Sequence, residues 1–224
     1  MSDDKYAQTR PLEVLNSRGL TAKREYVRGL EQRADAEALS LLVECLCDES
    51  WYLRGLAEEA FLRLSETGAP VLLPLLEQGL WFTRTSTAHV LGRVGYRPAV
   101  HGLLRLADDS NTTVANAARE ALIAIGHQRG AVSIAHALHR LAPDVRRRRL
   151  DELADLDRAL LERVERLMRS DELMSAESGD TLCDDDAVVR ATEDGVEWEL
   201  LTGPPSTRQR SGDNGSGHAG SPGA

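Results

Sequence analysis

Histidines and cysteines are the side chains of this sequence best suited to metal chemistry. His136 and His139 lie three residues apart, a spacing that places both imidazoles on one face of a helix, where they could share a zinc ion. Cys45 and Cys47 stand together at the end of another predicted helix. A structural zinc site needs four ligands, and the sequence places no further ligand beside either pair. We therefore interpret the histidines as surface residues and predict no metal and no cofactor.

Motifs that position a catalytic nucleophile or a phosphate are absent from the sequence. It has no glycine-rich phosphate loop, no Gly-x-Ser-x-Gly elbow and no His-Glu-x-x-His motif. The three cysteines, Cys45, Cys47 and Cys183, are odd in number and widely split, which favours reduced thiols over a disulfide framework. We predict no catalytic residue.

Charge is distributed unevenly along the chain. Residues 1–170 contain 24 basic and 24 acidic side chains, which leaves 3 bases and 12 acids for residues 171–224. A neutral body lacks the basic field expected of a nucleic-acid binder. The polar N-terminus lacks the apolar core of a secretory signal, and no apolar stretch approaches the roughly 20 residues that span a bilayer. We expect a cytoplasmic protein without membrane contact.

Repeated helices are the elements that must position the side chains. Three segments, 51–64, 81–94 and 112–125, align without gaps, and their starts lie 30 and 31 residues apart. Their apolar columns fall at offsets of 4, 8 and 11 residues from the first, as in Leu53, Ala57, Phe61 and Leu64. These offsets follow the helical period, so each segment is predicted to bury one stripe of a helix.

A second predicted helix precedes each of these segments. The preceding helices span residues 36–46, 70–78 and 99–107, and a fourth spans 131–141. Polar residues at 48–50 and 108–111 can cap the helices that follow them. The middle turn, 78–80, lacks an aspartate, which leaves open whether a ladder of side-chain contacts between successive repeats passes through this turn.

Leu53-Arg54-x-x-Ala57 in the first segment and Val114-x-x-x-Ala118 in the third resemble HEAT repeats. The resemblance is closest to the short bacterial repeats of phycobilin-lyase-like proteins and covers residues 35–141. It implies an all-α, armadillo-like α-solenoid of about three to four helix pairs, which more often binds partners than catalyses one reaction. No histidine is followed by glutamate, so the dipeptides of the di-iron HEAT-repeat enzyme deoxyhypusine hydroxylase are absent.

Helical caps and a tail are expected around the repeats. Residues 1–34 are predicted as an N-terminal helical cap and 142–170 as one C-terminal capping helix. Residues 171–201 form an acidic linker with a predicted β-hairpin, because residues on either side of Asp194-Gly195 alternate in polarity. Whether this hairpin docks on the repeats is left open. Residues 202–224 are rich in Gly, Ser and Pro and are expected to be disordered.

Equivalent positions of the repeats supply the candidate partner-binding residues. Trp51 and Trp81 begin successive segments, where they either pack against a helix end or form an aromatic anchor pair. The resemblance implies that Arg54 and Arg84 pair with turn carboxylates, and that the outward side chains line a concave face. These outward side chains, hereafter the outward row, carry charges of both signs, which suits a protein partner better than a phosphate backbone. The predicted partner-binding residues are Trp51, Tyr52, Arg54, Glu58, Trp81, Thr85, Arg84, His89, Asn116 and Arg119.

Four consecutive arginines, Arg146, Arg147, Arg148 and Arg149, begin the last predicted helix. Consecutive residues fan around a helix, so the four cannot all face one partner. We interpret the run as a solvated turn or as a contact for the acidic run 184–186, in preference to a nucleic-acid site.

The sequence favours a non-catalytic protein-binding scaffold, or adaptor, whose partner is a protein or peptide. Family resemblance alone implies an alternative, a phycobilin-lyase-like subunit that handles a chromophore. A third hypothesis is a HEAT-like DNA glycosylase, with Trp51 and Trp81 as the base cradle and Glu58 as the catalytic carboxylate. The neutral body and the pI of 5.2 count against this enzyme. The partner's identity, a lyase activity and the oligomeric state are left open.

Overall fold

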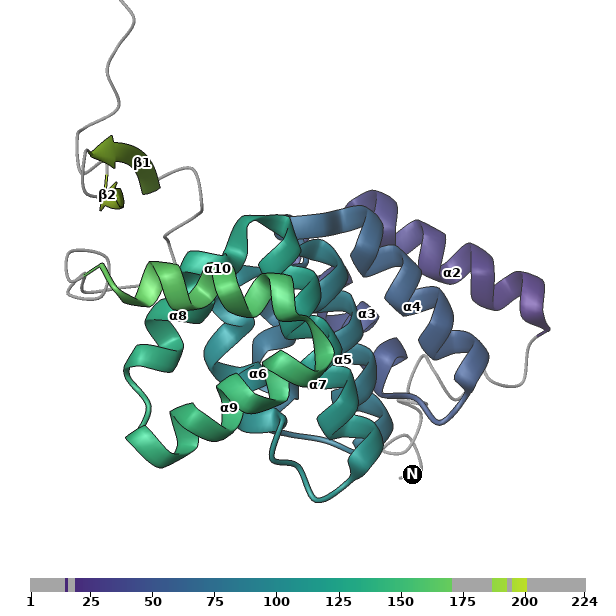
Figure 1. Cartoon of the computed structure of the whole chain (residues 1–224). Coiled ribbons are helices and arrows are strands. Elements are labelled where there is room, and N and C mark those ends of the chain that lie inside the picture. The colour runs from purple at the N-terminus through teal and green to yellow at the C-terminus, as the bar shows by residue number, and fades with distance from the viewer. Residues whose placement is uncertain (1–14, 16–18, 171–186, 193–194, 201–224) are drawn as a thin grey trace, which may run out of the picture.

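The computed structural model describes residue 15, residues 19–170 and two strands at 187–192 and 195–200 (Figure 1). The described body is helical. Its α-helices are α2 (Leu20–Arg33), α3 (Ala36–Cys47), α4 (Trp51–Leu64), α5 (Trp81–Val94), α6 (Val100–Leu106), α7 (Thr112–Ile125), α8 (Ala131–His139), α9 (Pro143–Leu156) and α10 (Arg158–Met168). Short 3-10 segments are η1 (Ser65–Thr67), η2 (Ala69–Leu76) and η3 (Arg97–Ala99), and a π-type turn, η4 (Gly126–Gly130), joins α7 to α8.

Two layers of helices form the body. In one layer α4 packs on α5 and α5 on α7, while in the other α3 packs on η2, η2 on α6 and α6 on α8 (Figure 1). Helix α2 covers α3 and α4 at the N-terminal end, and α10 packs against α8 at the C-terminal end. Each of α4, α5 and α7 begins and ends at the residues that the sequence alignment predicts.

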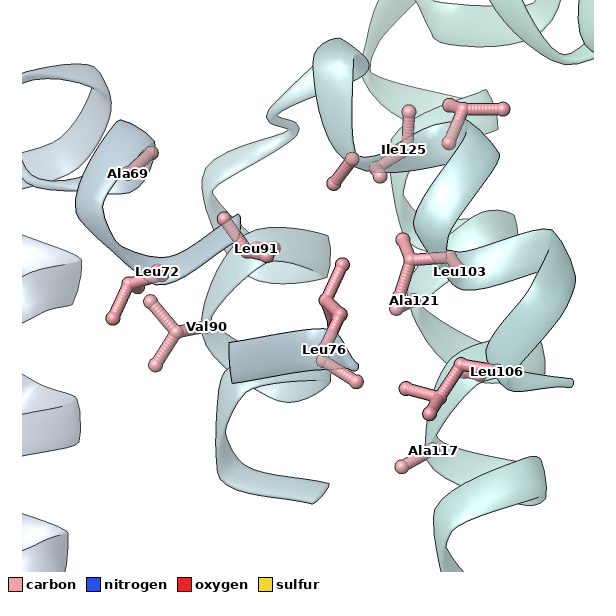
Figure 2. Close-up of a cluster of buried hydrophobic side chains, with 14 of the residues drawn as sticks. Ala69, Leu72, Leu76, Val90, Leu91, Leu103, Leu106, Ala117, Ala121 and Ile125 are labelled. Carbon is pink, nitrogen blue, oxygen red and sulfur yellow. The ribbon is translucent and has the colours of Figure 1, made fainter. Parts of the chain in front are cut away.

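Apolar columns of the three aligned segments form the seam between the layers. Leu53, Ala57 and Phe61 of α4 are fully buried, as are Val114 and Ala118 of α7. Figure 2 shows how leucines and alanines of η2, α5, α6 and α7 meet in this core. The predicted buried stripe is therefore confirmed at these positions, while Leu64 and Val94 of the last column are only partly buried.

Helices α5 and α7 approach closely because Gly92 has no side chain. A Cβ atom at Gly92 would lie 2.6 Å from the Cα of Ala121 and 2.7 Å from its Cβ. Small residues at both positions bring the two helix backbones together, so the distance between α5 and α7 is set by this contact.

Capping side chains explain where two helices of the first layer begin. Ser50 accepts a hydrogen bond from the backbone N–H of Leu53 at 3.4 Å, and Asn111 accepts one from that of Thr113 at 3.0 Å. The N-cap residue of α5 is Leu80, which provides no side-chain cap. Gly95 ends α5 with φ at +73°, a left-handed conformation that glycine adopts without steric cost.

The predicted α-helix 70–78 is instead the 3-10 segment η2. Pro74 lies inside it, and proline has no N–H to donate while its ring crowds the carbonyl one turn earlier. The backbone therefore tightens in this segment, although Leu72 and Leu76 still reach the core.

The prediction of a single capping helix at 142–170 is wrong, because the helix is interrupted at Asp157. Its φ and ψ of −154° and 92° end α9, and its carboxylate accepts the N–H of Leu160 at 2.9 Å to begin α10. Leu160, Val164 and Leu167 of α10 are buried, whereas Leu156 of α9 is 54% exposed. The break lets α10 turn back onto α8.

The hairpin predicted around Asp194-Gly195 is confirmed in its strands. β1 (Ala187–Thr192) pairs antiparallel with β2 (Gly195–Leu200), and Val189 lies opposite Trp198. The turn at 193–194, the N-terminal segment 1–14, the linker 171–186 and the tail 201–224 lie outside the described residues, so docking of the hairpin and disorder of the tail stay predictions. Within the described part of the chain, the helices are too short or too polar to cross a bilayer.

Candidate functional site

Trp51, Leu80 and Trp81 form an exposed apolar edge, hereafter the Trp edge, where α4 and α5 begin. Trp51 is 77% exposed, Leu80 56% and Trp81 50%. The Trp51 and Tyr52 rings meet edge to face at 5.9 Å between centroids, as do those of Trp81 and Phe82 at 5.8 Å. Of the two interpretations left open by the sequence, burial against a helix end does not describe these side chains, and their position suits an aromatic anchor pair.

Arg54 connects α4 to α5 near the starts of both helices. Its guanidinium lies 4.4 Å from the centroid of the Phe82 ring, and its Nη1 donates to the carbonyl of Asp48 at 2.9 Å. The turn before α5, residues 78–80, has no aspartate that could pair with Arg54, and Arg54 lies against the Phe82 ring.

Arg84 makes the equivalent connection to the third repeat. Its Nη1 donates to the carbonyl of Gly79 at 2.7 Å, and its Nη2 pairs with Asp109 at 2.9 Å. Asp109 is itself held in the turn by accepting the N–H of Asn111 at 2.8 Å. Arg84 therefore pairs with a turn carboxylate, as the resemblance implies. Arg54 instead contacts backbone carbonyls of its own turn and the Phe82 ring.

The outward row contains a hollow of about 310 Å³ between α4, α5 and α7. Its floor is made of small or apolar side chains, and charged side chains stand on its rim. The floor comprises Leu62, Val90, Gly92, Ala121 and Ala124, and the rim comprises Glu58, His89, Arg93 and Glu120. This row therefore has a concavity deep enough for one side chain of a partner.

Rim residues of the hollow have partners of their own. Glu58 accepts a short hydrogen bond from the hydroxyl of Ser86, a buried residue that the sequence analysis did not single out. His89 Nε2 lies 3.8 Å from a carboxylate oxygen of Glu120. The hydrogen bond from Ser86 of α5 therefore orients Glu58. The Glu120 side chain remains largely exposed, at 70%.

Two of the four remaining predicted site residues, Tyr52 and Arg119, join elements, while Thr85 and Asn116 are bonded within their own helices. The Tyr52 hydroxyl accepts from Arg24 of α2 at 3.1 Å, and the Thr85 hydroxyl donates to its own helix at the carbonyl of Trp81. Arg119 donates to exposed Asn116 at 3.1 Å and to the carbonyl of Ala107 at 2.9 Å. Tyr52 and Arg119 therefore lie at contacts between helices, and the other predicted site residues belong to the Trp edge, to the hollow or to the outer surface of one helix.

Arg149 of the arginine run is a buried structural residue, so the solvated interpretation is wrong for it. Its side chain is 4% exposed, pairs with Asp108 and with Glu152 at 2.6 Å, and donates to the carbonyl of Leu104 at 3.2 Å. Arg148 also pairs with Asp108, at 3.0 Å. Contact with the acidic tail stays a prediction for Arg146, Arg147 and exposed Arg148.

Burial also corrects the interpretation of the metal candidates. His136 is fully buried in α8, not a surface residue, whereas His139 is exposed. Burial raises the pKa of the Cys45 thiol to about 12. The pKa of the Cys47 thiol is also raised, because this thiol is partly desolvated although the residue lies at the surface. Both thiols are therefore protonated near neutral pH and poorly suited to nucleophilic chemistry. In the described segments no three His, Cys, Asp or Glu side chains converge on a metal position.

No known protein family and no curated protein matches this chain. The functional argument therefore depends on the geometry of the Trp edge and the hollow.

Proposed function

We propose that this chain is a HEAT-type α-solenoid that acts as a non-catalytic protein-binding scaffold, and that its partner contacts the Trp edge. Helices stacked in two layers and the links from Arg54 and Arg84 to the following repeat support the solenoid interpretation. Such a stack offers a long surface on which neighbouring repeats contribute equivalent side chains.

The exposure of Trp51 and Trp81 is the observation that carries the proposal. Tryptophan is costly to leave in water, because each ring buries about 150–250 Å² of surface when it is covered. Tryptophan is also enriched among the residues that dominate binding energy at protein interfaces. Two such rings on adjacent helices, with Leu80 beside them, fit a protein surface that covers them together.

Affinity capture with a double variant tests the proposal. The native chain and Trp51→Ala/Trp81→Ala are immobilised and exposed to the same native cell extract, after circular dichroism shows equal helicity. We expect a discrete set of proteins that the native chain retains and the double variant loses.

Leu156→Ala is the matched control, because Leu156 is similarly exposed but lies on α9. This variant should retain the same proteins as the native chain. Equal capture by the Trp double variant, or loss in the Leu156 variant as well, would contradict the assignment of the Trp edge.

A further inference from the structure

The hollow between α4, α5 and α7 combines an apolar floor with carboxylates on opposite walls. Glu58 stands on α4 and Glu120 on α7, and α5 lies between these helices because it packs on both. The floor is open because Gly92, Ala121 and Ala124 are small, and Gly92 also draws α5 and α7 together. The cavity therefore exists because of the same small residues that set the helix packing.

One kind of side chain matches both parts of this hollow. A long basic side chain has an apolar stem, which can cover an apolar floor, and a charged head that stays near the rim. The planar guanidinium of arginine presents five N–H donors in a fixed fork, so it can donate to more than one acceptor on the rim. The ammonium of lysine is a compact and strongly hydrated charge, which fits two separated acceptors less well.

We propose that the hollow is an arginine-binding pocket that receives one arginine side chain of the protein partner. The inference rests on the proposed function, since it names the chemistry by which the partner is recognised beside the Trp edge. The rim carries two carboxylates, those of Glu58 and Glu120, and one guanidinium, that of Arg93, so acidic groups outnumber the guanidinium. Charge complementarity selects a cation as the occupant.

Titration of the isotopically labelled chain with N-acetyl-arginine methylamide tests the pocket without knowledge of the partner. We expect saturable chemical-shift changes in the amides of residues 58, 92, 120 and 124, and no comparable change with the uncharged citrulline analogue. Glu58→Gln and Glu120→Gln should each weaken binding roughly two- to fivefold, as expected for partly exposed ion pairs. Ala124→Met should abolish binding, because the longer side chain fills the floor and remains a good helix former.

Arg93→Gln separates loss of a specific charge from general damage, because removal of the competing cation should strengthen binding. Glu66→Gln, at an exposed residue of η1, should change nothing. Equal responses to the arginine and citrulline probes, no response, or weaker binding in Arg93→Gln would overturn the pocket. Loss of the arginine response while the Trp edge still determines capture would reject this inference alone, and the proposed function would stand.

Discussion

Asp157 holds two helices in place with one carboxylate. It accepts the N–H of Leu160, which begins α10, and one of its oxygens lies 2.7 Å from His127 Nε2 in the turn after α7. The Leu160 hydrogen bond, followed by the His127 contact, lowers the pKa of Asp157. This carboxylate therefore fixes the angle at which α10 returns to α8.

Asp157→Ala is expected to reduce the free energy of unfolding by about 0.5–2 kcal/mol at pH 7, the range for loss of an N-cap. Because the folded pKa lies below the unfolded value, the carboxylate's contribution is present above the ordinary aspartate pKa and is lost as pH falls through the folded pKa. Urea denaturation at pH 7 and at pH 3 measures this change. A difference between variant and native chain that does not shrink at pH 3 would refute the assignment, and exposed Asp155→Ala is the control.

Two neighbouring arginines should differ sharply in their effect on stability. Arg149→Gln removes a buried guanidinium from Asp108, Glu152 and the Leu104 carbonyl, so we expect a loss of about 1.5–3 kcal/mol, as for hydrogen bonds to charged groups. Arg147→Gln, at an exposed position, should stay within about 0.5 kcal/mol of the native chain. Thermal denaturation of both variants measures the contrast, and equal effects would contradict the buried network.

Side-chain environments were the part least accessible from sequence. The sequence identifies Trp51 and Trp81 as equivalent, but their exposure depends on how neighbouring helix ends are offset. Arg149 could not be told apart from Arg147 because its partners Asp108 and Leu104 lie more than 40 residues earlier in the chain. Such pairs depend on where α9 crosses the body, which a local pattern does not encode.

At the scale of elements, Gly92 and Gly55 offer a matched pair of substitutions. Both lie within helices of the first layer, but a Cβ at Gly55 meets nothing within 4 Å whereas one at Gly92 meets the backbone of Ala121. Gly92→Ala should destabilise the fold by roughly 1–3 kcal/mol through overpacking. Gly55→Ala should stabilise it by roughly 0.5–1 kcal/mol through the helix preference of alanine.

Chemical denaturation of both glycine variants measures these opposite signs. A neutral Gly92→Ala would show that α5 and α7 are not in the contact described, and destabilisation by Gly55→Ala would contradict the open space beside Gly55. The result bears on function as well, because the same close approach forms the floor of the hollow.

Helix boundaries were predictable where the repeat and the caps agreed. The alignment of three segments fixed α4, α5 and α7, since register in one repeat constrains the others. The break between α9 and α10 was missed because Leu153, Leu156 and Leu160 keep helical spacing across Asp157. The capping capacity of Asp157 is the sequence signal that could have indicated a new helix start.

At the scale of the whole molecule, equivalent positions of the packed helices α4, α5 and α7 form an extended surface. The Trp edge lies at the start of α4 and α5, and the hollow lies further along the same helices, between α4, α5 and α7. A partner that spans both would bury tryptophan rings at one end and insert a basic side chain at the other. Stacked helices hold these sites at a fixed separation, which favours one extended partner segment over two independent ligands.

The most direct test replaces Trp81 with the photoreactive residue p-benzoylphenylalanine, which keeps an aromatic side chain at the edge, and irradiates the chain in native extract. The same replacement at Trp51 and at Leu156 provides a second probe and a control. The account predicts one shared protein cross-linked from positions 51 and 81 and absent from position 156. No protein adduct at 51 and 81, or the same adducts at 156, would contradict a partner bound at the Trp edge.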